Sequence, residues 1–291
     1  MKSSKSGPRA NNSMAKPLFQ YENWGLTVLP ADINMALEEF LLKRVAFSKN
    51  KQAALRFYTF AKDSIVLGYA QDTDVIKNLD KDVYLTRRIT GGSHVQTGQN
   101  TLAYSFVVPR DGNFSHFEEM RAYYASLVAK ALKNLGLGPI EVDNKASTIN
   151  VGSRIIASHA MFWGVKSALL HGIVILTPYD VDKIYRRVAL SERDIGGKTY
   201  SEYSALKKLP AVSKELPERK KPLILKPDFL RELVSRAITK EVAGERFRGM
   251  KVDNNVIKES MELLEKRYRD PIWIKEHQPT FTNSEAEAIP G

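Results

Sequence analysis

The sequence predicts an α+β protein in which mixed β-sheets are flanked by helices. In the first half of the chain, strand-like runs of aromatic and β-branched residues alternate with segments of helical period. Strand-like runs return after Val142, and two more segments of helical period follow towards the C-terminal end. No internal repeat is visible, so we expect a mixed architecture rather than a repeat array.

The composition limits the function. The 291 residues are 43% hydrophobic, which is enough to build a core in one large domain or two modest ones. The 44 Lys and Arg against 33 Asp and Glu give a net charge of +11, which favours acidic or phosphorylated partners. The absence of cysteine excludes disulfides, thiolate metal sites and a cysteine acyl-enzyme. No apolar run is long enough for a membrane span and no secretory signal is visible, so we expect a soluble, cytoplasmic protein that does not insert into a membrane.

The first predicted element is a helix that begins after Pro30. Asp32 is placed to cap its first turn, and apolar residues recur at helical spacing, at Ile33, Ala36, Leu37, Phe40 and Leu41. Glu38 and Glu39 are adjacent and therefore point in different directions, so we expect them to form a solvated face.

Three strands and a short helix follow. The runs 55–60 and 64–68 are rich in aromatic and β-branched residues and lie three residues apart, which predicts a hairpin. A short helix around 75–79 and a third strand, 83–89, complete a compact mixed sheet.

The stretch 87–110 is the best candidate for a ligand site. Arg87 and Arg88 end one strand, a loop with Gly91, Gly92 and Gly98 follows, and a strand begins at Thr101. The glycines permit close approach of the backbone, neutral polar side chains supply hydrogen bonds, and the stretch contains no acidic residue, which suits an anion such as a phosphate. The alternative is a hairpin with a long polar turn; the spacing is neither a P-loop nor a dinucleotide fingerprint.

A long helix is predicted between Ser115 and Gly136. Ser115 and Glu118 form a capping box, and Gly136 marks the C-terminal stop. Short strands joined by polar turns follow from Val142, with turns at Gly152 and at 164–167.

The predicted organisation has one main domain. Residues 1–17 form a disordered basic tail, 18–210 the main domain and 211–226 a Pro- and Lys-rich connection. A flexible basic loop is expected at 196–198. Two C-terminal helices, 227–242 and 255–268, pack on the main domain within 227–275, and 276–291 is a frayed tail.

Several short segments, in chain order, resemble one family. They are Asn-Met-Ala-Leu-Glu-Glu at 34–39, the strands 55–58 and 65–71, Arg-Arg-Ile-Thr-Gly-Gly at 87–92 with Asn100, His-Gly at 171–172, and the ending 264–273. Together they resemble the lipoate–protein ligase family, within the wider group of biotin and lipoyl attachment enzymes. The resemblance covers about residues 20–275 and implies the biotin/lipoate protein ligase fold, which is similar to class II synthetases.

The resemblance implies an enzyme that activates lipoate or octanoate with ATP and Mg²⁺ as an acyl-adenylate. The acyl group then passes to a lysine of a lipoyl acceptor domain protein, with a separately encoded accessory subunit as a further expected partner. An acyl-adenylate carries a phosphate and an apolar tail, so its site needs amides, a cation and an apolar slot. The residues expected to bind it are Tyr69, Gln71, Arg88, Gly91, Gly92, Ser93, Asn100 and His171, with the strand at 157–161 along the slot.

The sequence departs from the family at two places. The third glycine of the loop is Ser93 and the alanine after it is His94. The family's catalytic lysine falls on Ile155 without a gap and on Arg154 after a one-residue shift, which in a strand also reverses the face. Arg154 and Lys145 are therefore the predicted catalytic cations.

Other functions remain as alternatives. The missing lysine allows a catalytically degenerate relative that binds an acyl or nucleotide ligand, or serves as a partner subunit. His94, His159 and His171 have no metal-ligand spacing, so we expect no protein metal site apart from magnesium carried by ATP. No basic-aromatic motif indicates nucleic acid, and the glycine-rich loop typical of biotin ligases is absent.

Overall fold

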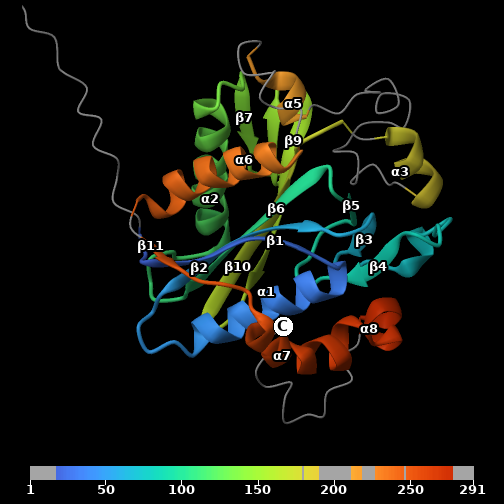
Figure 1. Cartoon of the computed structure of the whole chain (residues 1–291), viewed down its shortest axis with the longest axis horizontal. Coiled ribbons are helices and arrows are strands. Elements are labelled where there is room, and N and C mark those ends of the chain that lie inside the picture. Colours follow the sequence, from blue (N-terminus) through green and yellow to red (C-terminus); the bar gives the residue numbers. More distant parts are fainter. Residues whose placement is uncertain (1–17, 179, 190–210, 218–226, 246, 278–291) are drawn as a thin grey trace, which may run out of the picture.

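The computed structural model describes residues 18–178, 180–189, 211–217, 227–245 and 247–277. Within them the strands form an eight-stranded mixed sheet and a three-stranded sheet, with helices on both faces of the larger one (Figure 1). The predicted α+β class is confirmed. Residues 1–17, the loop at 196–198 and residues 278–291 lie outside the described residues.

The large sheet runs through the middle of the molecule. Its order is β11 (Phe247–Gly249), β1 (Tyr21–Leu29), β2 (Ala53–Phe60), β6 (Thr101–Pro109), β10 (Ser167–Ile175), β9 (Arg154–Trp163), β8 (Thr148–Val151) and β7 (Ile140–Asp143). The pairs β11–β1 and β1–β2 are parallel, and every later pair is antiparallel. The strands expected after Val142 are confirmed, whereas β1 and β11 were not predicted.

The small sheet corrects one expectation. It contains β4 (Tyr84–Arg87), β3 (Ser64–Leu67) and β5 (Val95–Thr97), with β3 in the middle. The hairpin predicted from the runs 55–60 and 64–68 is wrong, because β2 pairs with β1 and β6 on its two sides and β3 belongs to the other sheet. The expected helix at 75–79 is a single turn, η1 (Thr73–Val75).

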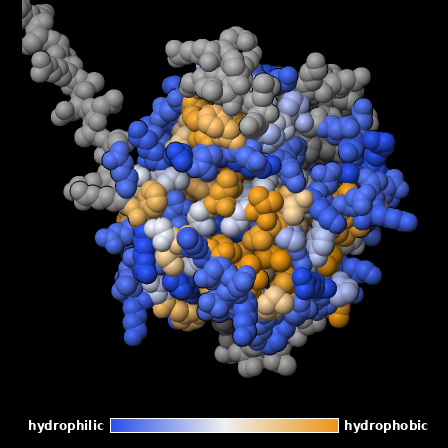
Figure 2. Space-filling view, viewed as in Figure 1, coloured by the Kyte–Doolittle hydropathy of each residue, from blue (hydrophilic) through white to orange (hydrophobic). Residues whose placement is uncertain are grey.

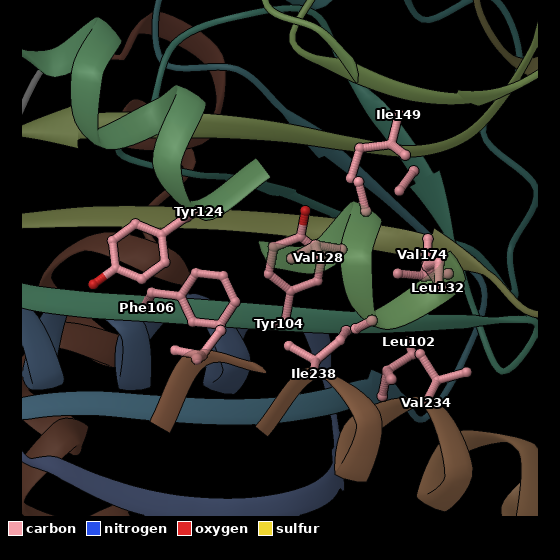
Figure 3. Packing of buried hydrophobic residues seen from close by; sticks show 14 of the residues in the cluster. Leu102, Tyr104, Phe106, Tyr124, Val128, Leu132, Ile149, Val174, Val234 and Ile238 are labelled. Carbon is pink, nitrogen blue, oxygen red and sulfur yellow. The ribbon is translucent and has the colours of Figure 1, made fainter. Parts of the chain in front are cut away.

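Two helical layers cover the large sheet. The helices α2 (Phe117–Asn134) and α6 (Pro227–Ala243) lie on one face, and α1 (Ala31–Ala46) and α7 (Asn254–Leu263) lie on the other (Figure 1). Side chains alternate between the two faces along β6 and so contribute to both interfaces. Tyr104 and Phe106 pack with Tyr124 of α2 (Figure 3). Ala103 packs with α1 on the other face. On the face shown in Figure 2, hydrophobic residues gather near the middle and hydrophilic ones surround them.

The helix starts follow the sequence with small differences. Asp32 lies in the first turn of α1, where it accepts the N–H of Ile33 and pairs with Arg269, both at 2.9 Å. The N-cap of α2 is His116 rather than Ser115, and its Nδ1 accepts from the N–H of Glu119. The predicted pair of Ser115 and Glu118 is therefore replaced by His116 and Glu119, and the Glu119 carboxylate accepts the N–H of Ser115, the residue before the N-cap, at 2.9 Å.

The remaining elements lie towards the C-terminal end. They are α3 (Val181–Arg187), α5 (Val212–Glu215), the π-helical segment η3 (Leu264–Tyr268) that continues α7, and α8 (Pro271–Glu276). Within the expected connection 211–226, the described residues 211–217 pack into the main core through Ala211, Val212 and Leu216. The predicted domain boundaries stay predictions. Among the described helices, none has the length and apolar character needed to cross a membrane.

Candidate active site

A cavity of about 570 Å³ lies where the two sheets meet. Its walls come from α1, β2, β3, β9 and β10, from the first turns of α2, from the turn between β7 and β8, and from residues 88–95, which we call the glycine loop. Apolar side chains make up much of the lining: Met35, Phe60, Val66, Val95, Phe117, Ile155, Met161 and Ile173. Within the described residues, no Asp or Glu lines it. The cavity thus has the size and mixed lining of a small-molecule site.

Arg88 organises the glycine loop. Its side chain is only 5% exposed, and its Nε donates to the Thr90 hydroxyl at 2.8 Å. Its Nη1 donates to the Val66 carbonyl at 3.2 Å, and its Nη2 donates to the carbonyls of Gly91 and Ser93, each at 2.7 Å. Burial lowers the pKa of Arg88 to about 10, so the guanidinium stays charged at neutral pH. The loop is therefore wrapped around a buried cation.

The glycine loop passes directly over the end of β3. A Cβ added to Gly68 would lie 1.8 Å from the carbonyl oxygen of Gly92, and Gly92 itself has a φ of +93°. Both positions thus need glycine, one for space and the other for backbone conformation.

We expect Gly68→Ala to lower the free energy of unfolding by about 1–3 kcal/mol, because the methyl group displaces the loop. Gly91→Ala is the matched control, since its Cβ would meet nothing within 4 Å. Urea unfolding of both variants checks this. Equal stability of the two would contradict the close approach seen between β3 and the loop.

Arg87 points away from the cavity. Its guanidinium donates to the carbonyls of Gly68, Tyr69 and Gln71 and, at 2.7–3.1 Å, to those of Trp273 and Ile274 in α8. This arginine ties the C-terminal end of α8 to the chain that enters the site.

Three of the residues expected to bind the acyl-adenylate lie outside the cavity lining. The Tyr69 ring lies against Trp273, with centroids 5.8 Å apart. The Gln71 side chain contacts His94 in the lining, with 3.4 Å between Nε2 and Nδ1. The Asn100 carbonyl accepts from the N–H groups that follow β10. The structure brings together Arg88, Gly91, Gly92, Ser93 and His171 instead.

His171 belongs to a buried polar chain. Its Nδ1 lies 2.6 Å from Glu38 Oε2, and its Nε2 lies 2.7 Å from the Thr90 hydroxyl. Because that hydroxyl already accepts from Arg88 Nε, we assign its proton to His171 Nε2, which places the imidazole N–H on Nδ1 facing Glu38. Tyr58 donates to the other Glu38 oxygen at 2.5 Å, and burial together with the Glu38 charge raises the pKa of this phenol well above its usual value.

The solvated face expected for Glu38 and Glu39 is therefore wrong. Glu38 is 1% and Glu39 2% exposed, because β2, β10 and η3 cover that side of α1. Glu39 accepts from Arg267 and from the Tyr268 hydroxyl, each at 2.8 Å. The chain Tyr58–Glu38–His171–Thr90–Arg88 was not predicted, apart from Arg88 and His171.

The two predicted catalytic cations are separated. Lys145 lines the cavity from the β7–β8 turn. Arg154 lies outside the lining and pairs with Glu215 of α5 at 2.8 Å, whereas the next residue, Ile155, lies in the wall. The geometry favours Lys145 over Arg154 as the cation that faces a ligand.

Two further polar residues in the wall are not among the predicted site residues. Arg121 reaches the cavity from α2, and His159 reaches it from β9. Burial and, after it, the nearby charge of Arg121 lower the pKa of His159 to about 4, so its imidazole is neutral at pH 7. Among the described residues, no cluster of His, Asp and Glu could hold a metal ion.

Comparison with curated proteins gives two relatives. The chain is 27% identical over 173 residues to lipoate–protein ligase 1 of Staphylococcus aureus, covering 57% of this chain and 49% of the relative. It is 29% identical over 178 residues to the octanoyltransferase LipM of Carboxydothermus hydrogenoformans, covering 53% and 63%. The chain thus spans about half of the first relative's length and less than two thirds of the second's.

Solved structures support the fold. A bipartite lipoate–protein ligase of an archaeal lipoylation system from Thermoplasma acidophilum matches with a TM-score of 0.71 at 19% identity, covering 90% of this chain and 99% of the other. Lipoate–protein ligase A bound with ATP matches with a TM-score of 0.70 at 20% identity, covering 89% and 100%. The predicted ligase fold is confirmed.

Family membership follows from the sequence match. The profile described as the lipoyl protein ligase A/B catalytic domain matches residues 30–223, which is more than half of the chain. That range begins at the residue before α1 and includes the glycine loop, His171 and both walls of the cavity. The chain therefore belongs to the lipoyl protein ligase A/B catalytic domain family.

Proposed function

We propose that this protein attaches a lipoyl or octanoyl group to a lysine of a lipoyl acceptor domain. Lipoate or octanoate is activated with ATP as an acyl-adenylate, and the magnesium ion enters with the ATP. Lipoate–protein ligase 1 and LipM support the two acyl groups, and the ATP-bound ligase structure supports the nucleotide.

The observation that carries the proposal is the lining of the cavity between the two sheets. The glycine loop offers backbone amides at Gly91, Gly92 and Ser93 next to the buried Arg88 charge, which suits a phosphate. Across the same cavity, Ile155, Met161 and Ile173 offer an apolar wall, which suits an acyl chain. An acyl-adenylate has both features in one molecule.

The proposed reaction has two steps. A carboxylate oxygen of the acid attacks the α-phosphorus of ATP, an O–P bond forms, and pyrophosphate leaves with the electron pair of the broken bond. The neutral ε-amine of the acceptor lysine then attacks the acyl carbon, a C–N bond forms, and AMP leaves as the nitrogen loses a proton. Since the partner supplies the nucleophile, a chain without cysteine suffices.

The acceptor is proposed to be a lipoyl domain of a larger enzyme. The Thermoplasma structure describes a lipoate ligase system together with its E2 lipoyl domain. The net charge of +11 favours an acidic partner surface. A separately encoded accessory subunit for the adenylation step is part of the proposal, since that ligase is bipartite.

Mass spectrometry of the acceptor tests the proposal in three arms. The chain is incubated with a lipoyl domain and with MgATP plus lipoate, with synthetic lipoyl-AMP, or with an octanoyl thioester. One added acyl group on one lysine is the expected product, from MgATP plus lipoate or from lipoyl-AMP. Product from the octanoyl thioester alone would overturn the ATP-dependent step. Product from lipoyl-AMP but not from MgATP plus lipoate indicates that an accessory subunit is needed. No mass increase in any arm would overturn the proposed activity.

A second candidate rests on Ile155, which occupies the cavity wall at the position where the family's lysine is expected. In this alternative the chain is a degenerate relative that binds an acyl or nucleotide ligand without turnover. Calorimetry with a non-hydrolysable acyl-AMP analogue separates the two when combined with the mass assay. Binding without transfer, followed by transfer in Ile155→Lys, favours the degenerate protein.

A further inference from the structure

We propose that Arg121, Lys145 and His159, which we call the basic corner, bind an oxyanion in the cavity and take over the role of a cation on β9. The group bound is an oxyanion of the substrate, either the carboxylate of the acyl acid or the phosphate of the nucleotide. This inference rests on the proposed function for the identity of the ligand.

Ser147 joins the three residues of the basic corner. It lies in the β7–β8 turn two residues after Lys145, and its hydroxyl accepts from Arg121 Nη1 at 3.2 Å. Its carbonyl accepts from the backbone N–H of His159 at 3.0 Å. One residue therefore connects α2, the turn and β9 beside the cavity.

The turn that carries Lys145 has a defined and strained backbone. Asp143 Oδ1 accepts from the N–H of Ala146 at 2.9 Å, which closes the turn. Ser147 has a φ of +57°, a conformation that is costly for a residue with a side chain. Strain of this kind persists where surrounding contacts impose it, and here those contacts are the hydrogen bonds to Arg121 and His159.

The basic corner carries polar groups with no partner among the described residues. Both ring nitrogens of His159, which is 7% exposed, and the Nε of Arg121 are buried without a hydrogen bond. Neither Arg121 nor Lys145 forms an ion pair with another described side chain, unlike Arg154, which pairs with Glu215. Buried polar groups are almost always hydrogen-bonded, so their presence beside a cavity indicates that a ligand completes them.

The positive charge around the basic corner favours an oxyanion as the ligand that completes these polar groups. Two cations and a neutral imidazole face a cavity whose described lining contains no Asp or Glu. Arg121 lies near the N-terminus of the eighteen-residue helix α2, where the helix dipole adds positive potential. A guanidinium and an ammonium both bind carboxylate and phosphate oxygens, and the neutral imidazole donates one further hydrogen bond.

The position of Ile155 gives the basic corner its proposed role. Strand β9 places Ile155 in the wall and directs Arg154 to Glu215, so neither residue supplies a cation to the cavity. Lys145 and Arg121 supply positive charge from two other elements instead. The family's charge is thus relocated from the strand to the adjacent turn and helix.

Calorimetric titration of the full chain with octanoate, AMP and a non-hydrolysable acyl-AMP analogue tests the inference. We expect Arg121→Met and Lys145→Met each to weaken binding of the analogue by about 10- to 100-fold. Lys133→Met, on the exposed side of α2, removes the same charge outside the cavity and is expected to bind as the wild type does. Lys145 is exposed in a turn, so its variant does not threaten folding. Weaker octanoate binding identifies the carboxylate, and weaker AMP binding identifies the phosphate.

A second measurement separates failure of the inference from failure of the proposed function. The imidazole resonances of His159 are followed by NMR during titration with octanoate and with inorganic phosphate. We expect one of these anions to shift them in the wild type but not in Arg121→Met. If the acyl-AMP analogue does not bind but an anion shifts His159, the proposed function fails and the basic corner stands. Unchanged resonances, or equal affinity in all variants, would overturn the basic corner.

Discussion

Replacing Arg88 by methionine is expected to lower the free energy of unfolding by about 3–5 kcal/mol. The guanidinium satisfies four acceptors, of which Thr90 Oγ1 and the Val66 carbonyl are buried. Gly91 is exposed and Ser93 is half-buried, so their carbonyls can bind water after the substitution. The two buried acceptors cannot, and the Thr90 hydroxyl also loses the donor that orients it towards His171.

Urea unfolding at neutral pH measures this effect. Arg154→Met is the matched control, because its guanidinium is 37% exposed and forms one ion pair with Glu215, for which we expect a loss of about 0–1 kcal/mol. Arg88→Lys should recover only part of the loss, since an ammonium cannot reach four acceptors in the plane of a guanidinium. A loss below about 1 kcal/mol for Arg88→Met would show that the glycine loop does not depend on this residue for its shape.

The local patterns were sufficient for most of the regular structure. The helical stripe after Pro30, the strand from Thr101 and the strands after Val142 all have a period that one face of a sheet or helix imposes on the sequence. The local sequence of a strand does not show which other strands it pairs with. The three residues between β2 and β3 look like a hairpin turn, yet β2 finds its two neighbours at β1 and β6. Pairing is decided by contacts far apart in the chain, which a short window of sequence does not contain.

In the candidate site, too, the features within one short stretch were predictable and those that depend on distant residues were not. The glycines and arginines at 87–92 mark a loop that approaches a ligand, and that loop lines the cavity. The sequence could not show that Arg87 binds α8 whereas Arg88 binds its own loop, because both partners of Arg87 in α8 lie more than 180 residues away. Two adjacent glutamates predict a solvated face, and no local pattern marks the buried partner of Glu38, His171, which lies 133 positions later in the chain. No sequence pattern marks Arg121 as a site residue, because a single cation in a helix is usually solvated.

Between about pH 7 and pH 4, the wild type is expected to lose about 3 kcal/mol more of its unfolding free energy than His159→Gln does. The pKa of His159 is lowered from 6.5 to about 4 in the folded protein, first by burial and then by the charge of Arg121. A histidine with a lowered folded pKa stabilises the protein above the unfolded pKa, where both states are neutral. As the pH falls from 6.5 to 4, the unfolded chain takes up a proton that the folded protein excludes, and this stabilisation is lost.

The measurement is the difference in unfolding free energy between wild type and His159→Gln, from urea unfolding at several pH values. Taking the difference removes the titration of groups common to both proteins, and it should be constant above about pH 7 and decrease towards pH 4. Because an oxyanion held by Arg121 and Lys145 would bring negative charge to the imidazole, saturating octanoate or phosphate should raise the pKa of His159 and reduce the decrease. A difference that does not vary with pH would mean that His159 is open to water in the folded protein. A decrease that neither anion alters would mean that no anion binds beside His159. The pH dependence thus tests whether His159 is buried and neutral, and the effect of the anions tests the basic corner.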